Sequence, residues 1–370
     1  MRKIFSFLLF FTATIAFSQN TYVFFGSYNW DKTKPGIYVC QLNLETGKLQ
    51  KVTETQGIFN PSFITLSPDG NYLYACTDAK MPVGSVSSFK FDPNKKELKF
   101  LNSQPSGGEN PVYVSVSGNG KWLANANYND GSFSIFPISN DGKIQPFVHN
   151  KKYSGEGSAN PKRQDHSHVH SAFFSPDFQQ LFFLDLGSDK IRGYEFDQSQ
   201  AEPISLKETF VKTESGFGPR HFSFHPNGKI GYAIGELSGE INVYNYASGK
   251  LDLIQKIKTH PEDLKEGFES SDVHVSPDGK FLYATNRGNE NNIAIFSVAA
   301  DGTLKNIGYQ SVYGKHPRTF AIDPSGNYLI VTNVNSSEAV VFKRDLKTGL
   351  LTKTDAVAME NVTCVQIQKI

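Results

Sequence analysis

The chain has 370 residues, of which 38% are hydrophobic and 20% are charged, a balance that is typical of a globular protein and excludes a disordered one. Its 37 basic and 36 acidic residues give a formal net charge of +1, which favours neither nucleic acid nor an anionic membrane surface as a partner. The 30 Phe and 16 Tyr favour strands over helices.

The N-terminus has the pattern of a secretory signal peptide. Two basic residues precede an apolar run over residues 4–17, which is too short to span a membrane, and small residues near Ser18 suit a signal peptidase. We therefore expect residues 1–18 to be removed. Residues 19–370 should then be exported, to the periplasm or beyond, as one domain that is free of the membrane and monomeric.

A short turn motif recurs along the whole chain. It has the form Ser/His/Asp-Pro-x-Gly and follows a short apolar run each time. The copies recur about every fifty residues, which is the period of a repeat protein. Clear copies stand at residues 67–70, 225–228, 276–279 and 323–326, and degenerate copies at 117–120 and 175–178.

Each repeat contains four short runs of alternating apolar and polar residues. A second turn, such as Asp141-Gly142 or Ser248-Gly249, keeps the same phase, and two further runs lie between the turns, as at residues 72–76 and 85–91. Four short antiparallel strands with tight turns make one blade of a β-propeller, which must stack on its neighbours to bury its faces.

The two ends of the chain complete the count of blades. Six full repeats are preceded by three predicted strands within residues 22–55 and followed by a single one at residues 362–368. We predict that the last strand joins the first three as the innermost strand of a seventh blade, a closure that removes open sheet edges. The sequence thus predicts an all-β, seven-bladed propeller of four-stranded antiparallel blades.

Three cysteines enter the expected oxidising compartment: Cys40, Cys76 and Cys364. Each lies in an apolar, strand-like run, where a free cysteine behaves as a small hydrophobic residue. Cys40 and Cys364 fall on strands two apart in the shared blade, too far from each other for a disulfide. We expect all three to be free.

One face of the propeller collects the unusual polar residues. The innermost strands begin there and the second strands end there, and we call this face the channel mouth. Residues 218–236 read as a hairpin with a Pro226-Asn227-Gly228 turn, so Arg220 and Glu236 should meet at the mouth. The corresponding positions of other blades hold Asn127, His168, His170, Asp185, Asp272, Arg287 and Arg318.

Three arginines around one mouth would repel one another unless negative charge compensates. Glu236 and nearby aspartates offset part of this charge, and a bound carboxylate or phosphate would complete it through forked hydrogen bonds. The alternative is that each arginine only makes an ion pair between neighbouring blades.

His166, His168 and His170 stand at alternate positions, which would place them on one face of a strand. Three imidazoles suit zinc, but the neighbouring guanidinium groups disfavour a dication, so we expect neither metal nor cofactor. His170 begins the inner strand and is the better candidate for proton transfer. The insertion at residues 148–166, just before these histidines, should overhang the mouth.

With these residues in place, the sequence resembles the seven-bladed propeller lactonase family, which includes bacterial 6-phosphogluconolactonases and a fungal carboxymuconate-lactonizing enzyme. The resemblance covers about residues 21–368, and Ser167 departs from it where a proline is expected. The segments that carry it are 25–28 (FGSY), 126–128 (ANY), 163–164 (RQ), 168–171 (HVHS), 185–187 (DLG), 218–221 (GPRH), 236–237 (EL), 286–288 (NRG) and 317–320 (PRTF).

This resemblance implies a set of catalytic residues, which fall by local motif on His170, Arg220, Glu236 and Arg287. It implies a metal-independent hydrolase that opens an anionic sugar lactone, in which Arg220 stabilises the oxyanion and either Glu236 or His170 is the general base. The residues expected to contact substrate are His168, Asn127, Asp185 and Arg318.

Two other functions stay open at this point. A muconate-type cycloisomerase would use the same groups in the lactone-forming direction. An exported propeller that only binds a glycan or a protein would need aromatic platforms and no pair of proton-transfer groups. His170 and Glu236 at the channel mouth favour chemistry over binding alone.

Overall fold

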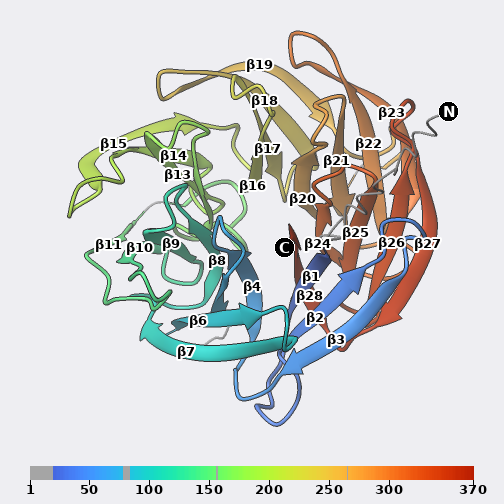
Figure 1. The fold of residues 1–370 in the computed structure, drawn as a ribbon. Coiled ribbons are helices and arrows are strands. Elements are labelled where there is room, and N and C mark those ends of the chain that lie inside the picture. Colours follow the sequence, from blue (N-terminus) through green and yellow to red (C-terminus); the bar gives the residue numbers. More distant parts are fainter. Residues whose placement is uncertain (1–19, 78–83, 156, 265) are drawn as a thin grey trace, which may run out of the picture.

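The computed structural model describes residues 20–77, 84–155, 157–264 and 266–370 (Figure 1). These residues form seven four-stranded antiparallel sheets arranged in a ring. The predicted all-β, seven-bladed propeller is confirmed. Within the described ranges no helix is long and apolar enough to cross a membrane. The predicted signal peptide, residues 1–18, lies outside the described residues.

In every blade the strands run in order from the centre of the ring to its rim. The first blade is β28 (Val362–Lys369), β1 (Thr21–Ser27), β2 (Ile37–Leu42) and β3 (Leu49–Thr55). The second is β4 (Pro61–Leu66), β5 (Tyr72–Thr77), β6 (Ser85–Asp92) and β7 (Glu97–Pro105). The third is β8 (Pro111–Val116), β9 (Trp122–Asn127), β10 (Ser132–Pro137) and β11 (His149–Lys152).

The remaining four blades follow the same plan. The fourth is β12 (Val169–Phe174), β13 (Gln180–Asp185), β14 (Lys190–Phe196) and β15 (Ile204–Lys212), and the fifth is β16 (Pro219–Phe224), β17 (Ile230–Gly235), β18 (Glu240–Ala247) and β19 (Lys250–Lys258). The sixth is β20 (Ser270–Val275), β21 (Phe281–Asn286), β22 (Asn292–Val298) and β23 (Leu304–Ser311), and the seventh is β24 (Pro317–Ile322), β25 (Tyr328–Asn333), β26 (Glu338–Arg344) and β27 (Leu351–Ala358).

The chain closes the ring with its last strand. β28 pairs with β1 in antiparallel register, with Phe24 opposite Gln366, and contacts the inner strands β24 and β4 of the two neighbouring blades. Figure 1 accordingly shows the C-terminus in the middle of the ring. The predicted closure of the first blade is therefore confirmed.

The recurrent turn owes its sequence to side-chain hydrogen bonds. In the first copy the Ser67 hydroxyl accepts a hydrogen bond from the Tyr72 amide at 2.9 Å and donates to Asp69. Gly70 has φ of 72°, a left-handed conformation that costs glycine least. The same serine–aspartate pairing recurs at Ser276 and Asp278, which explains why the motif repeats with the blades.

Burial follows the layering of the blades. All six residues of β17 are buried, because blades cover both of its faces, whereas Leu251 is the one buried residue of the rim strand β19. Cys40, Cys76 and Cys364 all lie within the described residues, where they are buried and form no disulfide, as expected.

All seven inner strands are irregular at the channel mouth. Each register shifts near the start of the pairing with the second strand, so that one or two inner-strand residues have no partner opposite. Such β-bulges redirect a side chain out of the regular alternation. The skipped residues are Ser62, Val112, His170, Arg220, Ser271, Asp272, Arg318, Thr319 and Thr363.

Deleting residues 360–370 should abolish cooperative folding, because it removes β28 and exposes the edges and core that this strand covers. Thermal unfolding followed by circular dichroism, with size-exclusion chromatography, measures this directly. A soluble truncated protein with a single sharp transition would contradict the role of β28 in closure.

Candidate active site

The predicted pair of Arg220 and Glu236 lies at the centre of the channel mouth. Arg220 is the bulged residue at the start of β16, and Glu236 follows β17 directly. The Arg220 Nε donates to Glu236 Oε2 at 2.8 Å, and both side chains are buried. The hairpin geometry predicted from the sequence is thus confirmed for this ion pair.

Two further arginines contact the same carboxylate. Arg287, just after β21, places Nη2 at 3.2 Å from Glu236 Oε2, and Arg163 places Nη2 at 2.5 Å from Oε1. Arg318, a bulged residue of β24, lies half-buried over the ring of Tyr28. One carboxylate therefore joins three guanidinium groups from separate parts of the chain.

This environment sets the ionisation of Glu236. Burial alone would raise its pKa, but Arg287, Arg220 and Arg163 outweigh it and hold the pKa well below the ordinary value. The group is therefore a carboxylate near neutral pH and a weak proton acceptor. This argues against Glu236 as the general base and for a role in holding the arginines.

His170 has the opposite character. It is the bulged residue of β12, it is 5% exposed, and its Nδ1 has no hydrogen-bond partner among the described residues. Burial, followed by the positive charge of Arg220 and the nearby His221, holds its pKa well below the ordinary value. The ring is therefore neutral near pH 7, with an uncommitted nitrogen.

A buried chain of hydrogen bonds, a relay through His221 to Asp272, also supports Arg220. The sequence pattern did not predict it. The Arg220 Nη1 lies 3.3 Å from His221 Nε2, and His221 Nδ1 lies 2.7 Å from Asp272 Oδ1. Because a carboxylate only accepts, His221 carries its hydrogen on Nδ1 and offers the Nε2 lone pair to Arg220. His221 and Asp272 also line a cavity of about 220 Å³ along the central channel.

Arg163 also pairs with Glu236, and it was not among the site residues predicted from the sequence. The insertion predicted at residues 148–166 is shorter than expected, because His149–Lys152 form β11, the rim strand of the third blade. The stretch after β11 brings Arg163 to Glu236, and the Arg163 Nη2 also donates to Tyr128 Oη at 3.2 Å. Its place in the Arg-Gln segment before the histidines was the available signal.

Asn127 and Asp185, two of the residues expected to contact substrate, are engaged within the protein. Both are fully buried. The Asp185 carboxylate accepts hydrogen bonds from Ser188 Oγ at 2.6 Å and Arg192 Nε at 3.0 Å. The Asn127 amide donates to Ser132 Oγ at 3.0 Å within its own blade. Both groups are occupied in fixing strands.

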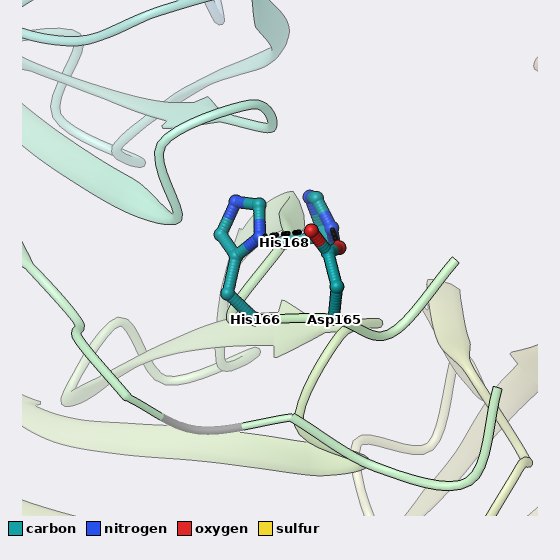
Figure 2. Close-up of side chains that lie close together, drawn as sticks. All are labelled: Asp165, His166 and His168. Atoms are coloured by element: carbon teal, nitrogen blue, oxygen red, sulfur yellow. Dashed lines mark hydrogen bonds and ion pairs between the residues drawn. The ribbon is translucent and has the colours of Figure 1, made fainter. Parts of the chain in front are cut away.

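The three histidines do not share a strand face. β12 begins at Val169, so His166 and His168 precede it, and the bulge turns His170 towards His221, with ring centroids 5.3 Å apart. His168 instead stacks on Tyr128 at 4.5 Å between centroids. Both of its nitrogens are engaged, Nδ1 by the Tyr128 carbonyl and Nε2 by Asp165 (Figure 2). Its contact with substrate stays a prediction.

A larger cavity lies away from this chemistry. Its volume is about 660 Å³, and it opens between the first two blades against side chains that include Phe59, Phe89 and Phe100. Lys32 is the one ionisable residue among its described lining residues.

Replacing Glu236 by Gln should lower the free energy of unfolding at pH 7 by about 3–5 kcal/mol, because it leaves buried guanidinium groups without their counter-charge. The folded pKa lies below the unfolded value of about 4.3, so the charge stabilises the fold above that pH. The difference in the free energy of unfolding between the variant and wild type should become smaller as the pH falls below about 4, because Glu236 of the wild type then begins to lose its charge in the unfolded chain.

Denaturant titrations of both proteins across this range measure the effect. Glu360→Gln is the matched control, since Glu360 is half-exposed and pairs only with Lys34 at the surface among the described residues. Equal stability of Glu236→Gln and wild type at pH 7 would contradict the role of the carboxylate.

Comparison with known proteins identifies the fold at the level of a family. The family described as "Lactonase, 7-bladed beta-propeller" matches residues 22–367. A 6-phosphogluconolactonase of Formosa agariphila is 42% identical over 335 residues, covering 90% of this chain and 94% of the relative. One of Bacillus subtilis is 33% identical over 320 residues, covering 86% and 89%.

Solved structures agree. A crystal structure from Bacteroides fragilis has a TM-score of 0.90 at 33% identity, covering 96% of this chain and 100% of that one. The periplasmic gluconolactonase PpgL of Pseudomonas aeruginosa has a TM-score of 0.87 at 31% identity, covering 94% and 99%. The chain therefore belongs to the seven-bladed β-propeller lactonase family.

Proposed function

We propose that this lactonase hydrolyses a sugar-type lactone that carries an anionic group. The observation that carries the proposal is the excess of positive charge at the channel mouth. Glu236 contacts Arg163, Arg220 and Arg287, and Arg318 is close enough to depress the pKa of the buried His170. Glu236 and the nearby Asp272 offset only part of the charge of Arg163, Arg220 and Arg287, and an anionic ligand would complete the balance.

The relatives support the same class of substrate. Two of them, at 42% and 33% identity, are named 6-phosphogluconolactonase, and one solved neighbour is named a periplasmic gluconolactonase. The periplasmic neighbour also supports export of this chain through residues 1–18. Hydrolysis is favoured over cycloisomerisation because the names of these relatives denote lactone-opening enzymes.

Binding is assigned to the outer arginines. Arg287 and Arg318 present planar guanidinium groups that suit a phosphate or carboxylate. Arg287 is itself positioned by hydrogen bonds, as its Nε donates to the Glu269 carbonyl at 3.1 Å. Arg220, fixed between Glu236 and the Ser271 carbonyl, polarises the ring carbonyl of the lactone and stabilises the oxyanion that develops there.

Proton transfer is assigned to His170. Its neutral ring removes a proton from water as the water oxygen bonds to the lactone carbonyl carbon. The tetrahedral intermediate then collapses, the ring C–O bond breaks, and the departing alkoxide takes the proton back from His170. The products are a hydroxy acid and the regenerated imidazole, so one residue serves as base and then as acid. Glu236 holds Arg220, Arg287 and Arg163 in place throughout.

His170→Gln should lower kcat for the best lactone by about 10²–10⁴ and change KM little, because the variant retains a polar side chain but loses proton transfer. Steady-state kinetics on a panel of δ- and γ-lactones measures this. His225→Gln, in a turn on the far face, is the control and should keep wild-type turnover. If His170→Gln also keeps wild-type turnover, the assignment of the base is wrong.

Arg287→Ala should raise KM for a phosphorylated lactone much more than for its uncharged counterpart. The loss of one charge-assisted contact to an anion is expected to cost about 1.5–3 kcal/mol in kcat/KM. Measuring kcat/KM of wild type and variant on gluconolactone with and without a 6-phosphate isolates the contribution of the contact between Arg287 and the phosphate. Equal losses for both substrates would show that Arg287 does not read the anionic group.

A further inference from the structure

A second cluster of chemical groups lies beside the arginines, and the proposed lactone chemistry does not use it. Asp165, His166 and His168 point in the same direction from the stretch that precedes β12 (Figure 2). Their possible ligand atoms all lie within 4.8 Å of one another. His166 Nδ1 is 3.0 Å from Asp165 Oδ2, and His168 Nε2 is 2.9 Å from Asp165 Oδ1.

The outer nitrogen of each ring is held by a backbone carbonyl. His166 Nε2 lies 2.7 Å from the Asn129 carbonyl, and His168 Nδ1 lies 2.9 Å from the Tyr128 carbonyl. Carbonyl oxygens only accept hydrogen bonds, so these two nitrogens carry the ring hydrogens. In the neutral rings, His166 Nδ1 and His168 Nε2 are then left with lone pairs that converge on Asp165.

This arrangement differs from that of an ordinary satisfied histidine. In His225, Nδ1 accepts a hydrogen bond from the Asn227 amide at 3.1 Å, while Nε2 donates to the Gly279 carbonyl at 3.0 Å. The rings of His166 and His168 instead meet an acceptor at both nitrogens. Two lone pairs and a carboxylate that share one space repel one another unless a positive charge lies between them, supplied either by a proton on a ring or by a bound cation.

A divalent metal ion meets this requirement. Metal-binding histidines donate their second N–H to a backbone carbonyl or a carboxylate, which fixes the tautomer and turns the lone pair towards the ion. Two imidazoles and one carboxylate form a three-ligand zinc set whose fourth position is left for water. The exposure of the Asp165 and His166 side chains, 57% and 39%, leaves room for that water.

The backbone that carries the cluster is held in place. A Cβ on Gly187 would lie 1.8 Å from the His166 carbonyl oxygen, and one on Gly131 would lie 2.3 Å from that of Ser167, so both glycines permit a close approach of the chain. Gln164, fully buried, donates to the Leu186 carbonyl and to Asp189, both at 2.8 Å. The ligand side chains thus project from a fixed support.

We propose that Asp165, His166 and His168 form a binding site for a Zn²⁺ ion at the channel mouth. The ion ties His168, which stacks on Tyr128, to the stretch that presents Arg163. Its role is to position Arg163 against Glu236. The site makes no bond to the lactone, so the inference stands apart from the proposed hydrolysis.

Zinc binding can be measured on the mature protein after treatment with a chelator and removal of that chelator. Titration with ZnCl₂ by calorimetry should give about one ion per chain, and the ion should raise the Tm. Asp165→Asn and His166→Gln should each weaken zinc binding by at least about tenfold. The Asp165 and His166 side chains are 57% and 39% exposed, and Gln at 166 can still donate to the Asn129 carbonyl, so the fold should survive.

His225→Ala is the matched control and should bind zinc as wild type does. Equal zinc affinity in wild type, Asp165→Asn and His166→Gln would overturn the proposal, since the ion would then bind elsewhere. The absence of any stoichiometric heat or Tm increase in wild type would also overturn it, since protonated rings would then supply the positive charge. Neither readout depends on lactonase activity.

Discussion

The buried carboxylate of Glu236 is the group on which the channel mouth depends. It meets guanidinium groups from the start of β16, from just after β21 and from the stretch before β12. Each charge alone would be expensive to bury, and the cluster is tolerated because the ionised groups satisfy one another. The same carboxylate is thereby removed from proton transfer, since its pKa is held low.

Because of this constraint, the residues that hold Arg220 in place at the channel mouth differ from the residue that is available for proton transfer. Glu236 and the relay of His221 and Asp272 fix Arg220 from two sides, whereas His170 keeps a nitrogen without a partner among the described residues. Asp185 resembles Glu236 in burial and in pairing with an arginine, but serine and backbone donors complete its shell. Glu236 lies one residue beyond the position on β17 that corresponds to Asp185 on β13, so the two carboxylates meet different neighbours.

The sequence contained the fold because blade architecture is local and repeated. The turn motifs and the alternation of the strands predicted the blades, and the incomplete first repeat predicted a seventh blade closed by the last strand. The hairpin pattern of residues 218–236 predicted that Arg220 meets Glu236. Arg163 could not be placed in this way, since the stretch that carries it has no periodicity. The histidines were misplaced because β12 begins later than alternation suggests and bulges at His170. The orientation of Asn127 depends on its hydrogen bond to Ser132, which the spacing of residues in the sequence does not reveal.

The position of β28 also imposes an order on folding. A chain that is synthesised from its N-terminus delivers β1, β2 and β3 first, yet their blade gains its inner strand only when the last residues arrive. Pairing across almost the full sequence carries a large loop-closure entropy, which the six intervening blades reduce by bringing both ends together. Ring closure therefore waits for the complete chain, and the molecule reaches its stable state only after its last residues have been synthesised.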